Sequence, residues 1–153
     1  MKTKFYILGL FLMGGLLFTS SCKKEAEEIV ASITKNIAVS IDGESWKTET
    51  VTTVKSNNKY FITALKGTEQ LIFSLKDLAV GTYAIDLSNN TAVFTNGTDP
   101  VKNIFSAGSG EVKITAIIKD GKEFEGTFNL VTINASGDVK IFTGGTMTNV
   151  LIP

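Results

Sequence analysis

The chain has 153 residues, with 15 basic and 15 acidic side chains, a single Cys and no His. All the basic residues are Lys, so the chain lacks both the usual general base at neutral pH and the guanidinium that grips phosphate in bidentate fashion. These absences exclude a His-dependent nucleophile, a His- or Cys-based metal site and an internal disulfide. The balanced charge gives no electrostatic footprint for nucleic acid, and we expect no cofactor.

The first 21 residues have the pattern of a targeting segment. Lys2 and Lys4 form a short positive region, and the apolar run Phe5–Phe18 has 14 residues, fewer than the roughly 20 that a membrane-spanning helix needs. Small residues follow at Thr19–Ser21, directly before Cys22. This arrangement favours a lipoprotein signal peptide that is cleaved before Cys22 over an ordinary secretory signal with an incidental cysteine.

The segment around this cysteine resembles the lipoprotein signals of Bacteroidota, in which an ending such as Ser21-Cys22-Lys23-Lys24 is frequent. Thr19 departs from the pattern, because many such signals carry Leu there. The resemblance implies that a lipid on Cys22 anchors the protein in the outer membrane, and several acyl chains make such an anchor stable. The run Lys23–Glu28, in which lysines are followed by clustered acids, resembles a signal for export to the cell surface. The alternative is a solvated tether with the domain facing the periplasm.

From Asn36 onward apolar and polar residues alternate, and Gly, Asn and Asp interrupt the alternation at short intervals. This pattern predicts short β-strands connected by tight turns. The clearest element is a hairpin in which Lys119-Asp120-Gly121-Lys122 forms a type I′ turn, followed by a strand with Phe128 buried and Thr127 exposed. The expected strands lie at 37–41, 46–54, 60–65, 71–75, 83–87, 92–95, 112–116, 124–130, 139–142 and 147–152.

About nine short strands with brief connections and no convincing helix leave no room for parallel crossover units. The sequence therefore predicts an all-β fold, either an antiparallel β-sandwich or a flattened meander barrel. Charged residues on one face of the late strands indicate a face toward solvent. The expected division is a signal peptide at 1–21, a lipidated, charged tether at 22–35 and an all-β domain at 36–153.

The segment from Ile41 to the end also resembles a family of small Bacteroidota lipoproteins that is known only as a domain of unknown function. The resemblance covers nearly the whole mature chain and implies an all-β fold and an envelope location, but it carries over no active-site residue. The matching motifs are Ile41-Asp42-Gly43-Glu44-Ser45-Trp46, Val80-Gly81-Thr82-Tyr83, Gly108-Ser109-Gly110-Glu111-Val112-Lys113-Ile114 and Phe124-Glu125-Gly126-Thr127-Phe128.

Two groups of carboxylates are candidates for acid–base chemistry. Asp42, Glu44 and Glu49 are close in sequence, and Glu123 and Glu125 follow the predicted hairpin turn. A carboxylate pair can hydrolyse a glycosidic bond when it is held at the right separation across a cleft. Because Glu123 and Glu125 share one strand face beside an exposed turn, we expect a solvated rim there instead.

Aromatic side chains are a second kind of candidate, because they could form a stacking platform for a sugar. In small β domains such residues are more often part of the core, which is what we expect here, and the side of Trp46 is the least determined. The aromatic residues concerned are Trp46, Tyr60, Tyr83 and Phe94.

Two further motifs have simple interpretations. Gly108-Ser109-Gly110 has the composition of a phosphate-binding loop, but it precedes a strand and not a helix, so we expect a flexible turn. The triplets that begin at Asn89, Asn96 and Asn134 would be glycosylation sites in a eukaryotic secretory pathway. In a bacterial lipoprotein they are expected to be turn residues.

These observations lead to three functional hypotheses. The first is a lipid-anchored, non-enzymatic envelope module that binds or scaffolds a partner and has a filled core. The second is a carrier of a small apolar ligand, with a lined cavity of some hundreds of Å³ inside a closed barrel. The third, more distant one is a carboxylate-dependent glycosidase, which needs a cleft with converging carboxylates.

Overall fold

The computed structural model of the protein describes residues 34–153, and this part of the chain consists of ten β-strands with no helix. The predicted signal peptide, the lipid attachment site Cys22 and the tether up to residue 33 lie outside the described residues. Within the described part, no helix is long and apolar enough to cross a membrane. The strands are β1 (Asn36–Ile41), β2 (Glu44–Thr48), β3 (Thr50–Ser56), β4 (Lys59–Lys66), β5 (Glu69–Leu75), β6 (Gly81–Ala84), β7 (Thr91–Thr95), β8 (Ile104–Ile118), β9 (Glu123–Ile133) and β10 (Val139–Leu151).

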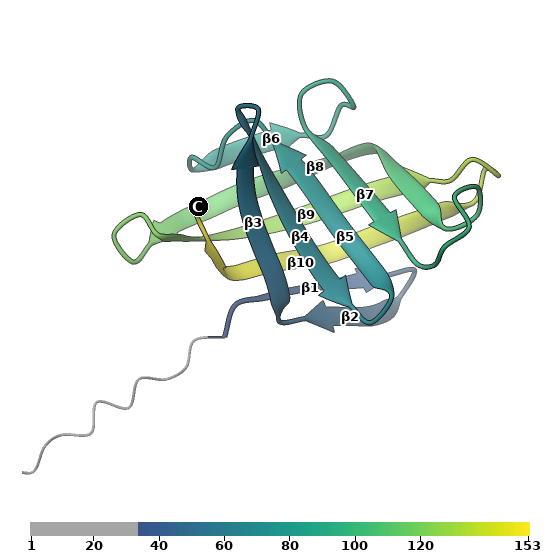
Figure 1. Cartoon of the computed structure of the whole chain (residues 1–153), viewed down its shortest axis with the longest axis horizontal. Coiled ribbons are helices and arrows are strands. Elements are labelled where there is room, and N and C mark those ends of the chain that lie inside the picture. The colour runs from purple at the N-terminus through teal and green to yellow at the C-terminus, as the bar shows by residue number, and fades with distance from the viewer. Residues whose placement is uncertain (1–33) are drawn as a thin grey trace, which may run out of the picture. The chain divides into compact units, whose positions relative to one another are not determined.

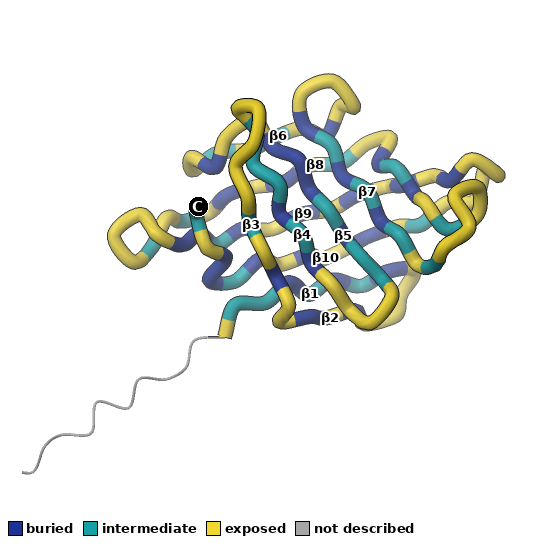
Figure 2. Tube along the Cα trace, in the orientation of Figure 1, coloured by how far each residue is buried: buried dark blue, intermediate teal, exposed yellow. Residues whose placement is uncertain are grey.

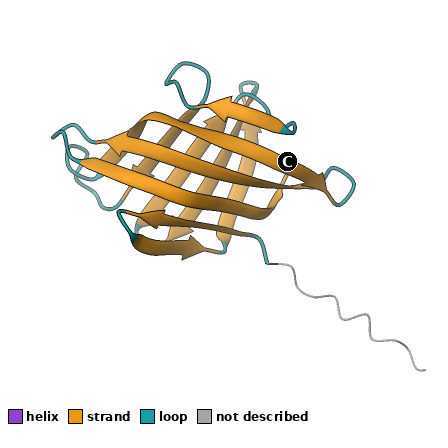
Figure 3. Cartoon of the chain, turned by 180° about the vertical axis from the view of Figure 1, so that it is seen from behind, coloured by secondary structure: helices purple, strands orange, loops and turns teal. Residues whose placement is uncertain are grey.

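The ten strands form one antiparallel sheet that folds over on itself. Their order is β2-β1-β10-β9-β8-β7-β5-β4-β3, and β6 pairs with β8 beside this path. In Figure 1 the strands β3, β4, β5 and β7 cross in front of β8, β9, β10 and β1. Figure 3 shows the second layer from behind. The result is a nearly closed, flattened barrel, which confirms the all-β prediction and is the second of the two predicted forms.

A sharp corner joins the two ends of the sheet. The edge strands β2 and β3 are consecutive in the chain and are connected by Glu49 alone. The Thr48 hydroxyl accepts a hydrogen bond from the Thr50 N–H (3.1 Å) and donates one to the carbonyl of Leu65 on β4. Our prediction of one strand over 46–54 was therefore wrong, because the chain bends at the corner and changes layer.

Large apolar side chains fill the inside of the barrel. Phe73 packs edge-on against Phe128, with ring centroids 4.9 Å apart, and Phe94 packs in the same way against Phe142 at 5.3 Å. Figure 2 shows how buried and exposed segments alternate along the strands, as the period of two predicts. This alternation places every second side chain of a strand in the core, as expected for a half-buried sheet.

The predicted hairpin between β8 and β9 is confirmed. The Lys122 N–H donates to the Lys119 carbonyl at 3.2 Å, and both central residues have positive φ angles, 56° at Asp120 and 85° at Gly121. On β9, Phe128 is 1% exposed and Thr127 is exposed. The type I′ geometry thus sets the register that separates these two neighbours.

The last two predicted strands are one strand in the structure. We expected a break between 139–142 and 147–152, but β10 is continuous over all 13 residues. Its register against β9 shifts twice, and each shift contains one residue of positive φ, Gly144 (61°) and Asn149 (51°). These are β-bulges, so the irregular sequence bends one strand instead of separating two.

The strand predicted at 83–87 is shorter than expected, since β6 ends at Ala84. Leu87 has a φ of 62°, which is incompatible with an extended strand. The N–H groups of Asn89 (2.8 Å) and Ser88 (3.0 Å) donate to the Asp86 carboxylate, and the Asn89 side-chain amide adds a third bond (3.2 Å). The two bonds from Asn89 are the main reason that the pKa of Asp86 is lowered to about 2.

The run Gly108-Ser109-Gly110 is not the flexible turn that we predicted, because it lies inside β8. The register against β9 shifts at Gly108, which makes it a β-bulge. At Gly110 the φ angle is 144°, and a Cβ there would lie 2.3 Å from the carbonyl oxygen of Asn129. The glycines therefore allow two long strands to bend together at close distance.

Candidate functional site

Two tight hairpin turns form one end of the barrel. The β1–β2 turn has positive φ angles at Asp42 (53°) and Gly43 (89°), as in a type I′ turn, and the β4–β5 turn has one at Gly67 (61°). Each turn places the last residue pair of its ladder, Ile41–Glu44 or Lys66–Glu69, at the end of the barrel. Between the hairpins lies a mostly polar pocket of about 300 Å³, the mouth pocket, lined by Ile41, Asp42, Glu44, Ser45, Trp46, Lys66, Glu69, Phe94 and Lys140.

Trp46 is the inner wall of the mouth pocket. Its side chain is 3% exposed and packs edge-on against Phe94, with ring centroids 6.4 Å apart. Its indole Nε1–H donates to Oε2 of Glu69 at 2.8 Å, and the Lys66 ammonium lies 5.9 Å from the ring centroid. The prediction that Trp46 belongs to the core is confirmed, and its ring offers no open stacking face.

The other aromatic candidates are placed as predicted or close to it. Phe94 is 2% exposed, while Tyr60 and Tyr83 are partly buried and pack against the core. The Tyr83 hydroxyl donates to the Ala79 carbonyl at 2.6 Å, and burial is the main cause that raises the pKa of Tyr83, followed by the charge of Asp77. Neither tyrosine lines the mouth pocket, and Phe94 meets Trp46 edge-on, so the four aromatics do not form a stacking platform.

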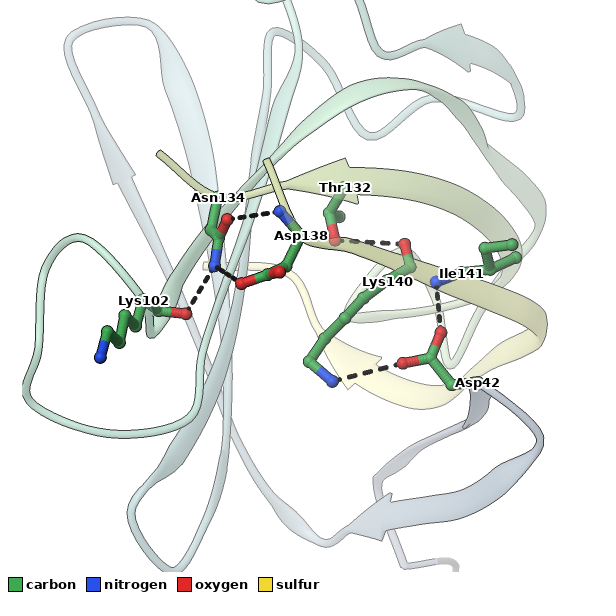
Figure 4. Close-up of polar contacts among 7 residues, drawn as sticks. All are labelled: Asp42, Lys102, Thr132, Asn134, Asp138, Lys140 and Ile141. Carbon is green, nitrogen blue, oxygen red and sulfur yellow. Dashed lines mark hydrogen bonds and ion pairs between the residues drawn. The ribbon is translucent and has the colours of Figure 1, made fainter. Parts of the chain in front are cut away.

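Asp42 connects the β1–β2 turn to β10. Its carboxylate accepts the Ile141 N–H on Oδ1 at 2.8 Å and forms an ion pair with Lys140 through Oδ2 at 3.3 Å (Figure 4). Lys140 also lies over the ring of Phe105, 5.2 Å from its centroid. Both carboxylate oxygens of Asp42 therefore have a partner on β10, and these two contacts hold the pocket wall in place.

Several polar groups of the mouth pocket are without such partners. Among residues 34–153, neither Glu44 nor Lys66 takes part in an ion pair, and Oε1 of Glu69 accepts no hydrogen bond from another of these residues. No three acidic side chains in this part of the chain gather into a group that could hold a metal ion. The pocket therefore presents two carboxylate acceptors and one ammonium donor.

The candidate carboxylates lie at opposite ends of the barrel. Asp42 contacts Ile141, whereas Glu123 pairs with Leu151 at the far end of β10, about 30 Å away along an extended strand. Asp42 and Glu44 line the mouth pocket. Glu49 lies outside it, and its Oε1 is 4.0 Å from the Lys47 Nζ. No cleft in the described part of the chain brings the two predicted groups together.

The prediction of a solvated rim was wrong for Glu123, which is only 9% exposed. Its Oε1 accepts a 2.8 Å bond from the Lys119 ammonium, and its buried Oε2 has no partner among the described residues. Both neighbouring strands carry a bulge opposite the start of β9, where Glu123 lies next to the buried Phe124. Glu125 remains partly exposed.

The three asparagines predicted as turn residues are confirmed in that role. The Asn96 N–H donates to the Asn103 carbonyl at 3.1 Å, and the Asn89 N–H donates to the Asp86 carboxylate in the loop after β6. Asn134 is buried and closes the β9–β10 turn: its Oδ1 accepts the N–H groups of Ser136 (3.0 Å) and Asp138 (2.8 Å). Its Nδ2 donates to the Lys102 carbonyl (2.8 Å) and to the Asp138 carboxylate (2.9 Å), as Figure 4 shows.

Three charged residues of the mouth pocket were not predicted from the sequence: Lys66, Glu69 and Lys140. A local signal existed for the first two, because they flank Gly67-Thr68, which is a turn sequence between two predicted strands. No local signal shows that this turn meets the β1–β2 turn, since Trp46 and Glu69 are 23 residues apart.

Comparison with known proteins identifies the family of the chain. Residues 34–151 match the model of a domain of unknown function, DUF6252, and this match covers nearly all of the β domain. No curated protein and no solved structure gives a significant match. The chain therefore belongs to the DUF6252 family.

Proposed function

We propose that this protein is a lipid-anchored module of the bacterial cell envelope that binds a small polar ligand in the mouth pocket and carries out no catalysis. The observation that supports binding is a pocket of about 300 Å³ beside a buried tryptophan, with charged side chains that form no ion pair within residues 34–153. Ligand sites of this size usually combine a preformed wall with a few well-placed polar groups. Here Trp46 and Glu69 hold each other through the 2.8 Å bond, so the wall is formed before a ligand arrives.

The same geometry is less favourable for the other two hypotheses. A carrier of apolar molecules needs an apolar cavity, whereas five fully buried phenylalanines occupy the inside of the barrel and the mouth pocket is mostly polar. A glycosidase needs a proton donor and a second carboxylate on opposite sides of a substrate. In the mouth pocket Asp42 is held by Lys140 and Ile141, and Glu69 is held by Trp46.

The proposed location rests on the sequence. The positive residues, the 14-residue apolar run and the small residues before Cys22 support a lipoprotein signal of the Bacteroidota type. In this proposal the lipid on Cys22 holds the domain at the outer membrane, and residues 22–35 act as a tether. The lysines and acidic residues after Cys22 favour display on the cell surface over the periplasmic side.

The anchoring proposal predicts a defined N-terminus. Mass spectrometry of the chain extracted from membranes should show acylated Cys22 as the first residue, because its thiol is the lipid acceptor. The Cys22→Ser variant should remain an unprocessed or mislocalised precursor. A mature N-terminus at any other residue contradicts lipid anchoring, and it leaves the question of ligand binding to a separate test.

A further inference from the structure

We propose that the ligand of the mouth pocket is a zwitterion of amino-acid to dipeptide size, with its ammonium group held by Glu69 and Glu44 and its carboxylate held by Lys66. This inference rests on the proposed binding function and specifies its ligand class. It follows from the charged groups of the pocket that form no ion pair within residues 34–153, two of them negative and one positive.

The acceptor side is built around Glu69. Oε2 of this carboxylate is fixed by the indole N–H of Trp46 at 2.8 Å, and the indole is itself locked by burial and by contact with Phe94. The orientation of Oε1 is therefore set without any ligand, and Oε1 has no donor among the described residues. Glu44 lines the same pocket from β2 and has no ion pair within residues 34–153. Two carboxylates in this state are suited to an alkylammonium group.

The donor side is Lys66. Its ammonium lies over the Trp46 ring at 5.9 Å from the centroid, a position that the attraction between a cation and the ring face maintains. Lys66 is directly opposite Glu69 in the β4–β5 ladder, yet the two side chains form no ion pair. One positive group therefore remains separate from the negative groups of the same pocket. A ligand with both charges can satisfy them together.

Other ligand classes leave part of this arrangement unsatisfied. A simple anion would meet two unpaired carboxylates, and an apolar molecule would remove water from three charged groups without replacing its hydrogen bonds. A sugar ring usually stacks on an open aromatic face, but Trp46 is 3% exposed and Lys66 lies over its ring. A simple amine suits the carboxylates but brings a second cation toward Lys66.

The chain contains a single tryptophan, and it forms the wall of this pocket. Its fluorescence and its indole N–H resonance therefore report on the mouth pocket alone, and both can be followed in the full chain in detergent. The probes are the dipeptide Ala-Ala, its N-acetyl derivative, its C-terminal amide and glucose. We expect Ala-Ala to shift both signals with saturation, and each blocked dipeptide to bind about tenfold or more weakly, because each lacks one charge-assisted contact. Glucose should have no effect.

Two variants assign the two ends of the ligand. Glu69→Gln keeps an acceptor for the indole N–H and removes the charge, so it should weaken Ala-Ala binding about tenfold or more. Lys66→Met should weaken Ala-Ala binding by a similar factor and should abolish the preference for Ala-Ala over its amide. Glu111→Gln and Lys113→Met are the matched controls, since both residues are exposed on β8 and do not line the pocket. They should leave binding unchanged.

The outcomes separate the ligand class from the function. Saturable binding of Ala-Ala that requires both of its charges supports the proposal. Saturable binding of glucose, or equal binding of Ala-Ala and its blocked forms, overturns the zwitterion assignment but retains a binding function for the pocket. If none of the probes shifts either tryptophan signal, both the ligand class and the proposed binding function are overturned.

Discussion

Phe128 and Thr127 are neighbours on β9 with opposite surroundings. Phe128 is 1% exposed and packs edge-on against Phe73, whereas Thr127 points to solvent. Phe128→Ala should therefore lower the free energy of unfolding by about 3–5 kcal/mol through cavity formation. Thr127→Ala should change it by less than about 1 kcal/mol, since it loses only β propensity and a surface contact. Denaturant unfolding followed by circular dichroism measures both, and equal losses would mean that the register of β9 is wrong.

The side chain of Asn134 makes several hydrogen bonds that hold the β9–β10 turn together. Its amide makes four hydrogen bonds, two of them to Asp138, and it is 6% exposed. Asn134→Ala removes all four hydrogen bonds that this buried side chain makes, so we expect a loss of about 2–3 kcal/mol of unfolding free energy. Asn89→Ala is the control, because Asn89 caps an exposed loop, and it should cost less than about 1 kcal/mol. A loss at Asn134 no larger than at Asn89 would contradict this role.

Single residues show how much of the burial in the structure can be predicted from the local sequence pattern. The burial of Phe128 and the core position of Trp46 were predictable, because alternation and aromatic character agree there. Glu123 was not predictable, since alternation puts it on the same strand face as the exposed Thr127 and the partly exposed Glu125, yet it is buried. Its burial depends on groups from other parts of the chain, such as the Lys119 ammonium, and alternation along one strand does not show them.

At the scale of one element, the turn of the β8–β9 hairpin allows the energetic cost of backbone strain to be measured without the cost of a steric clash. Gly121 has a φ of 85°, and no atom lies within 4 Å of the place that a Cβ would occupy, so a substitution there meets strain but no clash. Gly121→Val should cost about 1–2 kcal/mol of unfolding free energy, because a β-branched residue fits this region badly. Gly81→Val is the matched control: Gly81 lies in β6 with equally open space and no positive φ. It should cost less than about 1 kcal/mol in denaturant unfolding, and an equal cost at both glycines would exclude the turn geometry as the cause.

Most strands were predictable from alternation and turn residues, but their ends were less so. The segment 46–54 is rich in Thr and Val throughout, and nothing in its composition marks the corner at Glu49. The corner depends on the Thr48 hydroxyl, which meets Leu65 of another layer. In the opposite sense, β10 contains a glycine pair that interrupts the alternation, yet pairing with β9 and β1 on both sides keeps it continuous.

At the scale of the whole domain, the barrel could be predicted as a class but its strand order could not. Alternation determines which side of a strand is buried, while the identity of the neighbouring strand depends on contacts between distant segments. The mouth pocket shows the same limit, because it combines β1, β2, β10 and the β4–β5 turn. Its charged residues are ordinary turn and surface residues until these elements meet.

The pairing of β1 with β10 also determines when the domain can be completed. The first strand lies between β2 and the last strand, so Asn36 has its ladder partner, Thr148, only after nearly the entire domain has been made. Contacts of such high sequence separation slow folding, because a long loop must close before they form. Until residues 139–151 are available, β1 keeps one unpaired edge and the barrel stays open. The barrel therefore cannot close until the C-terminal segment has been made, however early the first strands form.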